Sequence, residues 1–425
     1  MTVTESWRGE NWFTSPWNHG PDAPALTHDI EVHDVTLRDG EQQTGVAFTA
    51  SDKIRIAEAL AEAGVHRIEA GLPAVSPEDE KAVRAIATRG LPSAIYAFSR
   101  CMAEDVRKAI DCGVAGVVME IPSSRHLIEA GYQWSVDKAI ELSVEATNLA
   151  HDNGLRVSFF PIDATRAAAE DYLAMVETVA THGHMDSLGL VDTFGVLAPH
   201  AVERFVTASR ERLNVPLETH FHMDYGLGVA NTLIAAAAGA GVLQTTVSGI
   251  GERAGNTPLE ETVVALKTLY GRDIGIRTEA LTPLARLVAR LSGVEQPSNR
   301  AVTGKRLFQI ESGIVSTWWR NVRSDVPNEA FPFLPSLVGQ DEPSLVLGKG
   351  SGIDNVGDAL GRLGIAATDE EMVEILAAVK KRGTELRGLV DDDEFERLVR
   401  DVLTGTAATD RVPDLIAQRQ PAITT

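Results

Sequence analysis

The sequence predicts an α/β protein, a (β/α)8 TIM barrel followed by a linker and a small helical subdomain. Short β-branched or apolar runs alternate with amphipathic segments rich in Ala and Glu. Such alternation indicates a parallel sheet with right-handed crossovers. Eight units in about 240 residues favour a closed barrel, and a doubly wound sheet would carry a Gly-rich loop where TLRDGEQ follows the first strand.

The expected elements follow from the pattern of apolar and turn residues. The eight predicted strands are residues 31–37, 66–70, 93–98, 116–121, 156–161, 187–192, 217–222 and 245–250. The clearest helical segments are residues 51–64, 102–113, 135–154 and 200–213. Ser51 and Ser135 are the expected N-caps, and Gly64, Gly113 and Gly154 the expected residues after helix ends.

The 425-residue length leaves room for more than a barrel. Residues 1–30 hold three of the six Trp and form an N-terminal extension, expected to pack on the barrel or on a partner subunit. The barrel covers residues 31–291, and a linker with five prolines covers 292–352. A helical subdomain follows at 353–405, and the tail at 406–425 is expected to be loose.

Composition excludes several classes of protein. A hydrophobic content of 44% with 23% charged residues is enough for a packed core and argues against extensive disorder. The formal net charge of −21 argues against a nucleic-acid partner. The two cysteines exclude a disulfide scaffold and favour a cytoplasmic location. Neither a signal peptide nor an apolar run long enough to span a membrane is expected.

Candidate metal ligands lie where strands end. His220 and His222 are two residues apart on the seventh strand, so both imidazoles face one side. Asp39 follows the first strand and completes a two-His, one-carboxylate set that suits Zn, Mn, Co or Fe, or Mg if waters complete the shell. The alternative for Arg38 and Asp39 is a surface turn with a local ion pair. Asn256, after a glycine-rich turn, is either a further oxygen ligand or an N-cap.

Seven segments together resemble a known superfamily. They are TLRDGEQ, IEAGLPAVSPED, DATR, DTFG, HFHMDYGLGVAN, GIGERAGNTPLEE and VLGKGSG. In this order they resemble the DRE-TIM metallolyases, and within them the Claisen-condensing branch of homocitrate, 2-isopropylmalate and citramalate synthases. The resemblance covers about residues 31–403 and implies a homodimer that condenses acetyl-CoA or a similar acyl-CoA with a 2-oxo acid.

The resemblance also implies roles for individual residues. Asp39, His220 and His222 bind a divalent metal with Asn256 close by, and Arg38 polarises a carbonyl or enolate oxygen. The substrate-binding residues it implies are Gln42, Glu69, Ser124, Arg166 and Thr193. Lys349, between glycines, is the candidate for contacting the anionic part of the acyl-CoA, because backbone N–H groups cluster there.

Two positions depart from the synthase pattern. Ile162 stands where the synthases carry a Glu that braces the catalytic Arg, and Val315 stands where they carry an acid–base His. Glu120 on the fourth strand is expected to face the interior and is a candidate for the missing brace. Glu311 and Tyr225 are candidates for the missing proton carrier, and spacing alone does not choose between them.

Three functions remain open at this point. The first is a metal-dependent acyltransferase that makes a 2-hydroxy dicarboxylic acid from an acyl-CoA and a 2-oxo acid. The second is a carbon–carbon lyase or aldolase acting on a hydroxy acid or acyl-CoA with the same metal site. The third is a non-catalytic metal- or ligand-binding paralogue. Loss of the His weakens the first relative to the second, while the linker and helical subdomain favour the first.

Overall fold

The computed structural model describes residues 7–405 except 22 and 25. It divides into two compact units, each described here by itself. The first unit comprises residues 14–304 and 337–340 with the described residues before Glu10, and the second comprises 10–13, 305–336 and 341–405. The predicted tail at 406–425 and the first six residues of the predicted extension lie outside the described residues.

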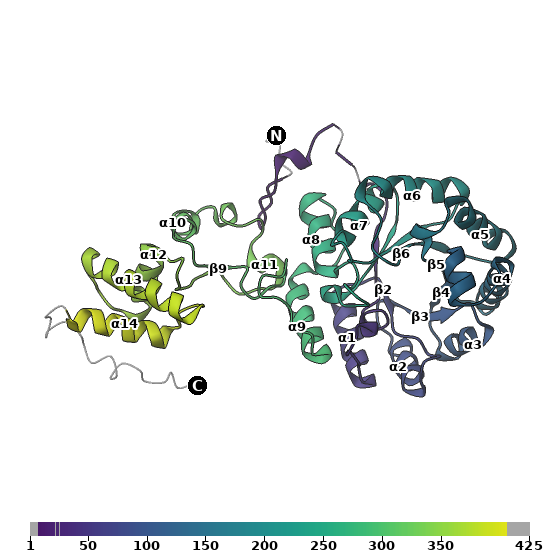
Figure 1. The fold of residues 1–425 in the computed structure, drawn as a ribbon, viewed down its shortest axis with the longest axis horizontal. Coiled ribbons are helices and arrows are strands. Elements are labelled where there is room, and N and C mark those ends of the chain that lie inside the picture. Colours follow the sequence, from purple (N-terminus) through teal and green to yellow (C-terminus); the bar gives the residue numbers. More distant parts are fainter. Residues whose placement is uncertain (1–6, 22, 25, 406–425) are drawn as a thin grey trace. The chain divides into compact units, whose positions relative to one another are not determined.

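A closed barrel of eight strands forms the first unit (Figure 1). Neighbouring strands are parallel, and β1 closes the ring by pairing with β8, with Glu31 opposite Val242. The strands are β1 (Glu31–Asp34), β2 (Arg67–Glu69), β3 (Ala94–Arg100), β4 (Gly116–Pro122), β5 (Arg156–Ile162), β6 (Ser187–Asp192), β7 (Leu217–Phe221) and β8 (Val242–Thr245). The predicted (β/α)8 barrel is confirmed.

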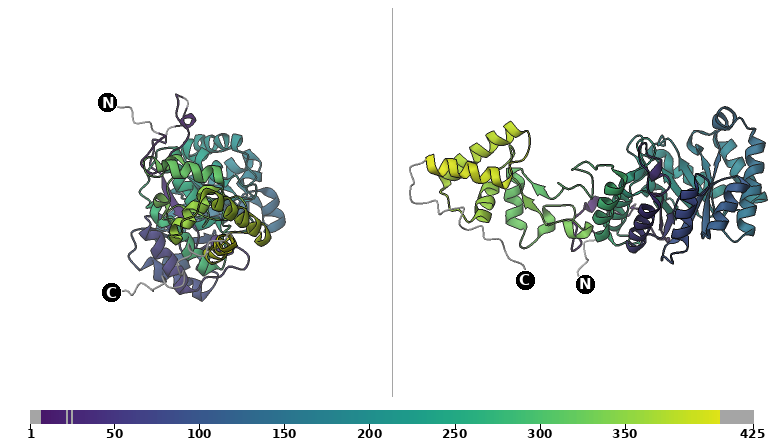
Figure 2. Two further views of the ribbon diagram at one scale, coloured as in Figure 1. Left: turned by 90° about the vertical axis from the view of Figure 1, so that its left-hand side faces the viewer. Right: turned by 90° about the horizontal axis from the view of Figure 1, so that it is seen from below.

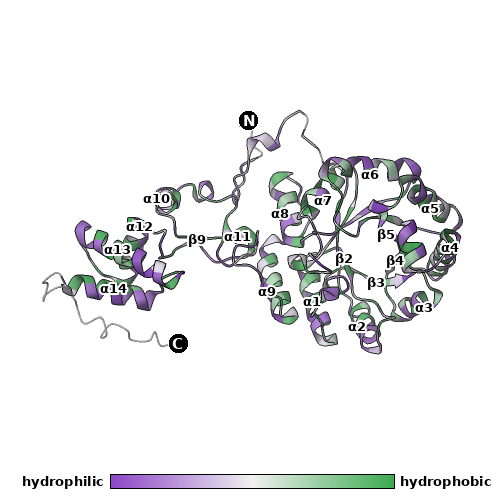
Figure 3. Ribbon diagram, in the orientation of Figure 1, coloured by the Kyte–Doolittle hydropathy of each residue, from purple (hydrophilic) through white to green (hydrophobic). Residues whose placement is uncertain are grey.

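Nine helices accompany the described strands of this unit. They are α1 (Ala50–Glu62), α2 (Pro77–Ala87), α3 (Ala103–Cys112), α4 (Val136–Asp152), α5 (Ala169–His182), α6 (Pro199–Arg212), α7 (Gly228–Ala237), α8 (Leu259–Leu269) and α9 (Leu281–Ser292). Figures 1 and 2 show the helices as an outer layer around the strands. Each helix carries both hydrophobic and hydrophilic residues (Figure 3), as expected for one face on the sheet and one in solvent.

Local sequence explains where the helices begin and end. Ser135 caps α4 by accepting a hydrogen bond from the Lys138 backbone N–H, as predicted. The cap of α1 is Thr49 and not the predicted Ser51, because Thr49 and Asp52 form a reciprocal capping box. Gly113 ends α3 with a left-handed φ of 75°, which a residue without Cβ adopts at little cost.

The predicted eighth strand was placed too late in the sequence. The strand is Val242–Thr245, whereas residues 245–250 were expected. Val247–Gly249 forms a short 3-10 turn in which Ser248 has a left-handed φ of 57°. Most of the segment TTVSGI therefore forms a turn at the barrel rim, although its β-branched residues are typical of a strand. The residues that pair with β1 are 242–245.

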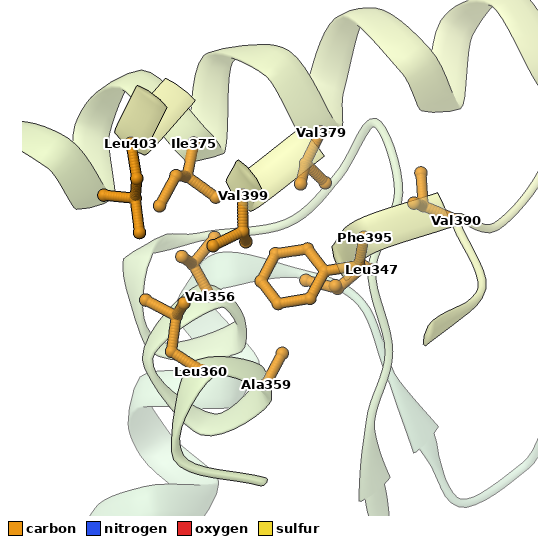
Figure 4. Packing of buried hydrophobic residues seen from close by; sticks show 10 residues of the cluster. All are labelled: Leu347, Val356, Ala359, Leu360, Ile375, Val379, Val390, Phe395, Val399 and Leu403. Atoms are coloured by element: carbon orange, nitrogen blue, oxygen red, sulfur yellow. The ribbon is translucent and has the colours of Figure 1, made fainter. Parts of the chain in front are cut away.

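The second unit has its own core. A parallel pair, β9 (Gln309–Ile310) and β10 (Ser344–Leu345), precedes α12 (Ile353–Leu363), α13 (Asp369–Leu386) and α14 (Asp392–Gly405). Helix α10 (Gly313–Val322) belongs to the same unit, and α11 (Pro335–Val338) crosses the boundary between the units, since residues 337–340 belong to the first. Phe395 lies fully buried at the centre of an aliphatic cluster contributed mainly by α12, α13 and α14 (Figure 4). In the part of the chain that the structure describes, no helix combines the length and apolarity that a membrane span needs.

Candidate metal centre

Three side chains from opposite ends of the barrel sequence meet at one point. The Nε2 atom of His220 lies 3.1 Å from Oδ2 of Asp39 and 3.2 Å from Nε2 of His222. His222 Nε2 lies 3.6 Å from the same carboxylate oxygen, and one ligand atom from each residue lies within 4.8 Å of the others. All three residues are buried. The structure thus brings together the three residues that the sequence analysis selected as metal ligands.

Hydrogen bonds on the far side of each imidazole orient both rings. His220 Nδ1 lies 2.9 Å from Oε1 of Gln244, and His222 Nδ1 lies 3.2 Å from the carbonyl oxygen of Gly255. Carbonyl oxygens only accept hydrogen bonds, so Nδ1 donates in both rings and the Nε2 lone pairs face each other and Asp39. Gln244 was not among the candidates from the sequence, because the predicted strand begins at residue 245, directly after it, whereas the observed strand begins at Val242.

Electrostatics favour the deprotonated forms that ligate a metal. Burial opposes ionisation of Asp39, but the adjacent positive charge of Arg38 is the first of the effects that outweigh it, and the pKa of this carboxyl lies well below its usual range. Burial lowers the pKa of His222 to about 4, against the opposing effect of Asp39. Neutral imidazole and ionised carboxylate are the species that bind a divalent cation.

Asn256 adds an observation that fits a cation. Its Nδ2 donates to the carbonyl of Ile250 at 3.2 Å, while its buried Oδ1 has no partner in the described structure. Asn256 is bridged through its backbone to His222, so the amide belongs to the same rim. A buried amide oxygen without a donor is costly unless a ligand completes it, so the donor set fits a divalent metal.

Glycines allow the backbone of this part of the rim to pack closely. A Cβ at Gly255 would lie 1.8 Å from the carbonyl oxygen of Gly249, and a Cβ at Gly251 would lie 2.2 Å from Nδ2 of Asn256. Both glycines also have positive φ, 87° and 152°. The loop therefore brings the Gly255 carbonyl to His222 along a path that a side chain would block.

Arg38 lies beside the three convergent residues and is itself held on several sides. Its Nε donates to the buried carboxylate of Glu69 in a short contact, and Nη1 donates to Oε1 of Gln42 at 3.2 Å. The guanidinium also lies 4.1 Å above the ring of Phe98, and its buried Nη2 has no partner among the described atoms. One donor thus remains for a ligand next to Asp39.

Glu120 was the sequence candidate for bracing Arg38, but the structure gives that contact to Glu69. The carboxylate of Glu120 instead accepts a hydrogen bond from the hydroxyl of Tyr132 at 3.3 Å. Burial raises the pKa of Glu120, although the positive charge of Arg38 opposes this. Glu120 faces the barrel interior, as predicted, because Val118, two residues earlier on β4, packs in the interior.

Three predicted substrate-binding residues share one partner that sequence analysis did not select. Asp163 accepts hydrogen bonds from Ser124 Oγ at 2.5 Å and from Arg166 Nε at 2.6 Å. Its backbone N–H donates to Thr193 Oγ1 at 2.7 Å. Asp163 is fully buried with a left-handed φ of 63°, a conformation that Asp tolerates better than most residues. The three side chains are together, but Asp163 already engages their polar atoms.

The other predicted residues are placed differently. The Tyr225 side chain is 73% exposed. Glu311 and Lys349 belong to the second unit, where Oε1 of Glu311 accepts a hydrogen bond from the backbone N–H of Gly350 at 2.7 Å. Lys349 lines a pocket of about 580 Å³ in that unit together with Arg387. The glycine loop that was expected to bind an anion is thus partly occupied by the chain's own carboxylate.

Comparisons with known proteins extend over most of the chain. The HMGL-like family model matches residues 29–288. The homocitrate synthase AksA of Methanopyrus kandleri is 40% identical over 89% of this chain and 94% of its own length. A putative (R)-citramalate synthase from the same organism is 38% identical, over 90% of this chain and 74% of its own length.

A solved structure shows the same barrel at lower identity. The hydroxymethylglutaryl-CoA lyase of Pseudomonas aeruginosa matches with a TM-score of 0.57 and 22% identity, covering 66% of this chain and 97% of the lyase. At this identity the likeness supports the fold and carries no argument about the reaction.

Proposed function

Because the chain belongs to the HMGL-like family, within its branch of Claisen-condensing synthases, we propose that it is a metal-dependent acyltransferase. It condenses acetyl-CoA or a similar acyl-CoA with a 2-oxo acid to give a 2-hydroxy dicarboxylic acid. The observation that carries the proposal is the convergence of Asp39, His220 and His222 beside the unpartnered Nη2 of Arg38.

Asp39, His220 and His222 would hold the metal, with the Oδ1 of Asn256 as a further oxygen donor. When bound, a divalent cation such as Zn, Mn, Co or Mg supplies Lewis-acid polarisation of a carbonyl oxygen. Imidazole and carboxylate ligands together suit Zn, Mn and Co, and they suit Mg if waters complete the shell.

The proposed reaction balances without a redox partner. The methyl carbon of the acetyl group loses a proton and forms a bond to the keto carbon of the 2-oxo acid. The keto oxygen takes up a proton and becomes a hydroxyl. Water then cleaves the thioester, which releases a carboxylate and the free thiol of CoA.

Arg38 has the position to stabilise the oxygen that gains negative charge. Its Nη2 is buried and free, and Glu69 and Gln42 fix the plane of the guanidinium. A donor held in place before the reaction stabilises developing charge without reorganising. Glu69 thus takes the bracing role in this proposal, and the carboxylate missing at Ile162 is not required for it.

Proton transfer is proposed for a smaller set of residues. Glu120 is buried at the interior face, burial raises its pKa above the usual range of a carboxyl group, and a hydrogen bond from Tyr132 orients it. Tyr225 is exposed near the barrel rim, and Glu311 remains a candidate from the second unit. Ser124, Arg166 and Thr193 are proposed to bind the substrate carboxylate with Asp163 as their common support.

Several broader expectations accompany this function as proposals. We expect a cytoplasmic homodimer, with Lys349 contacting the anionic part of the acyl-CoA. The domain plan is an extension, a catalytic barrel, a linker and a helical subdomain.

A thiol-release assay tests the proposal. The full chain is incubated with acetyl-CoA and a panel of 2-oxo acids, with divalent metal or with chelator. Release of free thiol that requires both the oxo acid and the metal is expected. Cleavage of a 2-hydroxy acid without CoA release would replace the proposal with a lyase, and metal binding without turnover would leave a binding protein.

A further inference from the structure

An apolar cluster reaches the metal centre from inside the barrel. Its buried members are Tyr96, Phe98, Val118, Phe160 and Val191, with Leu72, Ala94 and Ile162 packed against them. We call this the interior apolar cluster. Within this cluster, the Phe98 ring packs against the guanidinium of Arg38. The Phe160 ring contacts the His220 ring edge to face, with the ring centroids 4.9 Å apart. Apolar carbon therefore contacts both a metal-ligand candidate and the guanidinium proposed to bind the keto oxygen.

A pocket opens beside this cluster. It has a volume of about 300 Å³ and is lined by Leu72 and Arg38 together with Val46, Ala47 and Val75. Its two carboxylates, Glu41 and Asp79, both hold the buried ammonium of Lys53, at 2.6 and 2.5 Å. The free part of the wall is thus largely apolar, with Arg38 at one side.

The cations near the strand ends already have anionic partners. Among the described residues, such pairs include Arg38 with Glu69, Arg100 with Asp105, Arg166 with Asp163, and Arg253 with Asp224. The Arg166 and Arg253 pairs are two-pronged, with both nitrogen–oxygen distances at or below 3.1 Å. Among these four arginines, Arg38 alone has a buried side-chain nitrogen without a hydrogen-bond partner, and this Nη2 atom belongs to the guanidinium that the proposed reaction uses.

The proposed function assigns Arg166 to the carboxylate that every 2-oxo acid carries, so a second carboxylate on the substrate would enter a site with no further cation for it. Burial of an anion without a partner is strongly unfavourable, whereas burial of aliphatic carbon against Phe98, Phe160 and Leu72 is favourable. Glu120, which also faces this interior, would make a nearby anion less favourable still whenever it is ionised.

We infer that the 2-oxo acid used by this protein carries a short, uncharged aliphatic side chain, which binds against the interior apolar cluster. The inference rests on the proposed function and narrows its substrate class. It excludes dicarboxylic 2-oxo acids as preferred substrates.

Two readouts test it on the full-length, metal-loaded chain. Binding of pyruvate, 2-oxobutanoate, 3-methyl-2-oxobutanoate and 2-oxoglutarate is measured by calorimetry without acetyl-CoA, and thiol release is measured with it. The best aliphatic acid is expected to exceed 2-oxoglutarate at least 100-fold in kcat/KM and in affinity. A preference for 2-oxoglutarate in both assays would overturn the inference while leaving the proposed function intact.

Two other outcomes distinguish a failure of the proposed condensation from a failure of the inferred substrate preference. Tight binding of aliphatic 2-oxo acids with no thiol release would refute the proposed condensation but support the proposed apolar site for the substrate side chain. No binding of any 2-oxo acid would refute both. These results are distinguishable because binding is measured without the acyl donor.

A matched pair of variants locates the site. Leu72→Arg places a cation in the interior apolar cluster and is expected to lower the preference for the aliphatic acid over 2-oxoglutarate at least tenfold. Leu269→Arg, the same change at the end of α8, is expected to leave the preference unchanged. Metal content measured for both variants shows whether the metal centre is intact. An unchanged preference in Leu72→Arg with full metal content would overturn the placement.

Discussion

The strand β7 carries two buried polar networks that differ in whether their atoms are satisfied. At its lower end, Glu218 accepts hydrogen bonds from Ser187, Arg67 and Gln244, at 2.6 to 3.0 Å. At its upper end, the lone pairs of His220 and His222 face each other and Asp39. Both ends point inward from one strand. Both carboxylate oxygens of Glu218 accept hydrogen bonds from protein donors, which makes this carboxylate structural, whereas the lone pairs at the upper end are left for a ligand.

The largest expected effect is at the upper network. Asp39→Asn removes the one carboxylate of the metal centre, so thiol release is expected to fall at least about 1000-fold and bound metal to be lost. Metal analysis and the thiol assay measure this, with circular dichroism showing retained fold. The exposed Asp171→Asn serves as the control. Full metal content and activity in Asp39→Asn would refute the assignment.

The lower network should respond in stability. Glu218→Ala leaves Arg67 and Gln244 without their buried partner, and we expect a loss of about 3–5 kcal/mol in the free energy of unfolding. Urea denaturation of the metal-free protein measures it. Comparable loss in Asp39→Asn would contradict the distinction between the two ends, since removing one of several converging polar groups there is expected to cost little stability.

Gln244 joins the two networks, because its amide oxygen faces His220 and its amide nitrogen faces Glu218. Gln244→Ala frees the His220 ring to rotate or change tautomer, so metal affinity is expected to fall about 10- to 100-fold. Competition with a chelator of known affinity gives the value. Gln340→Ala, whose amide lies outside the barrel interior, is the matched control. Unchanged metal affinity would show that Gln244 orients nothing.

The smallest effect concerns pH. Burial raises the pKa of Asp34 from 3.8 to about 7. The folded state therefore keeps its proton while the unfolded state ionises, and stability falls as pH rises from about 4 to about 7. Asp34→Asn removes this loss, so its melting temperature should exceed that of wild type by roughly 2–4 °C at pH 8 and match it near pH 4. An equal difference in melting temperature at both pH values would refute the raised pKa of Asp34.

The barrel and the convergent triad could be predicted because each depends on a short-range rule. Strand–helix alternation fixes the ring, and a two-residue period puts His220 and His222 on one face. Parallel strands in a closed ring then bring Asp39 after β1 close to β7. The contacts that support these residues depend on side chains from other strands, and no single-strand rule selects them.

Glu69, Asp163 and Gln244 illustrate what the sequence concealed. Glu69 was expected to line the site, but only the structure shows that it, and not Glu120, contacts Arg38. Asp163 was passed over because its role depends on a left-handed turn that joins it to Ser124 and Arg166. Gln244 lay one residue outside the predicted strand, because TTVSGI resembles a strand by propensity but forms a turn.

The tight loop from Gly249 to Asn256 affects which residues of the site can be substituted without altering the metal ligands. Gly255 supplies His222 with a backbone oxygen, and its own missing side chain is what lets that oxygen arrive. The orientation of this imidazole is thus set by main-chain atoms, which substitution does not alter unless the loop itself moves. Substitutions at Leu72 or Ile162 can therefore change the substrate preference while the geometry of the metal ligands stays the same.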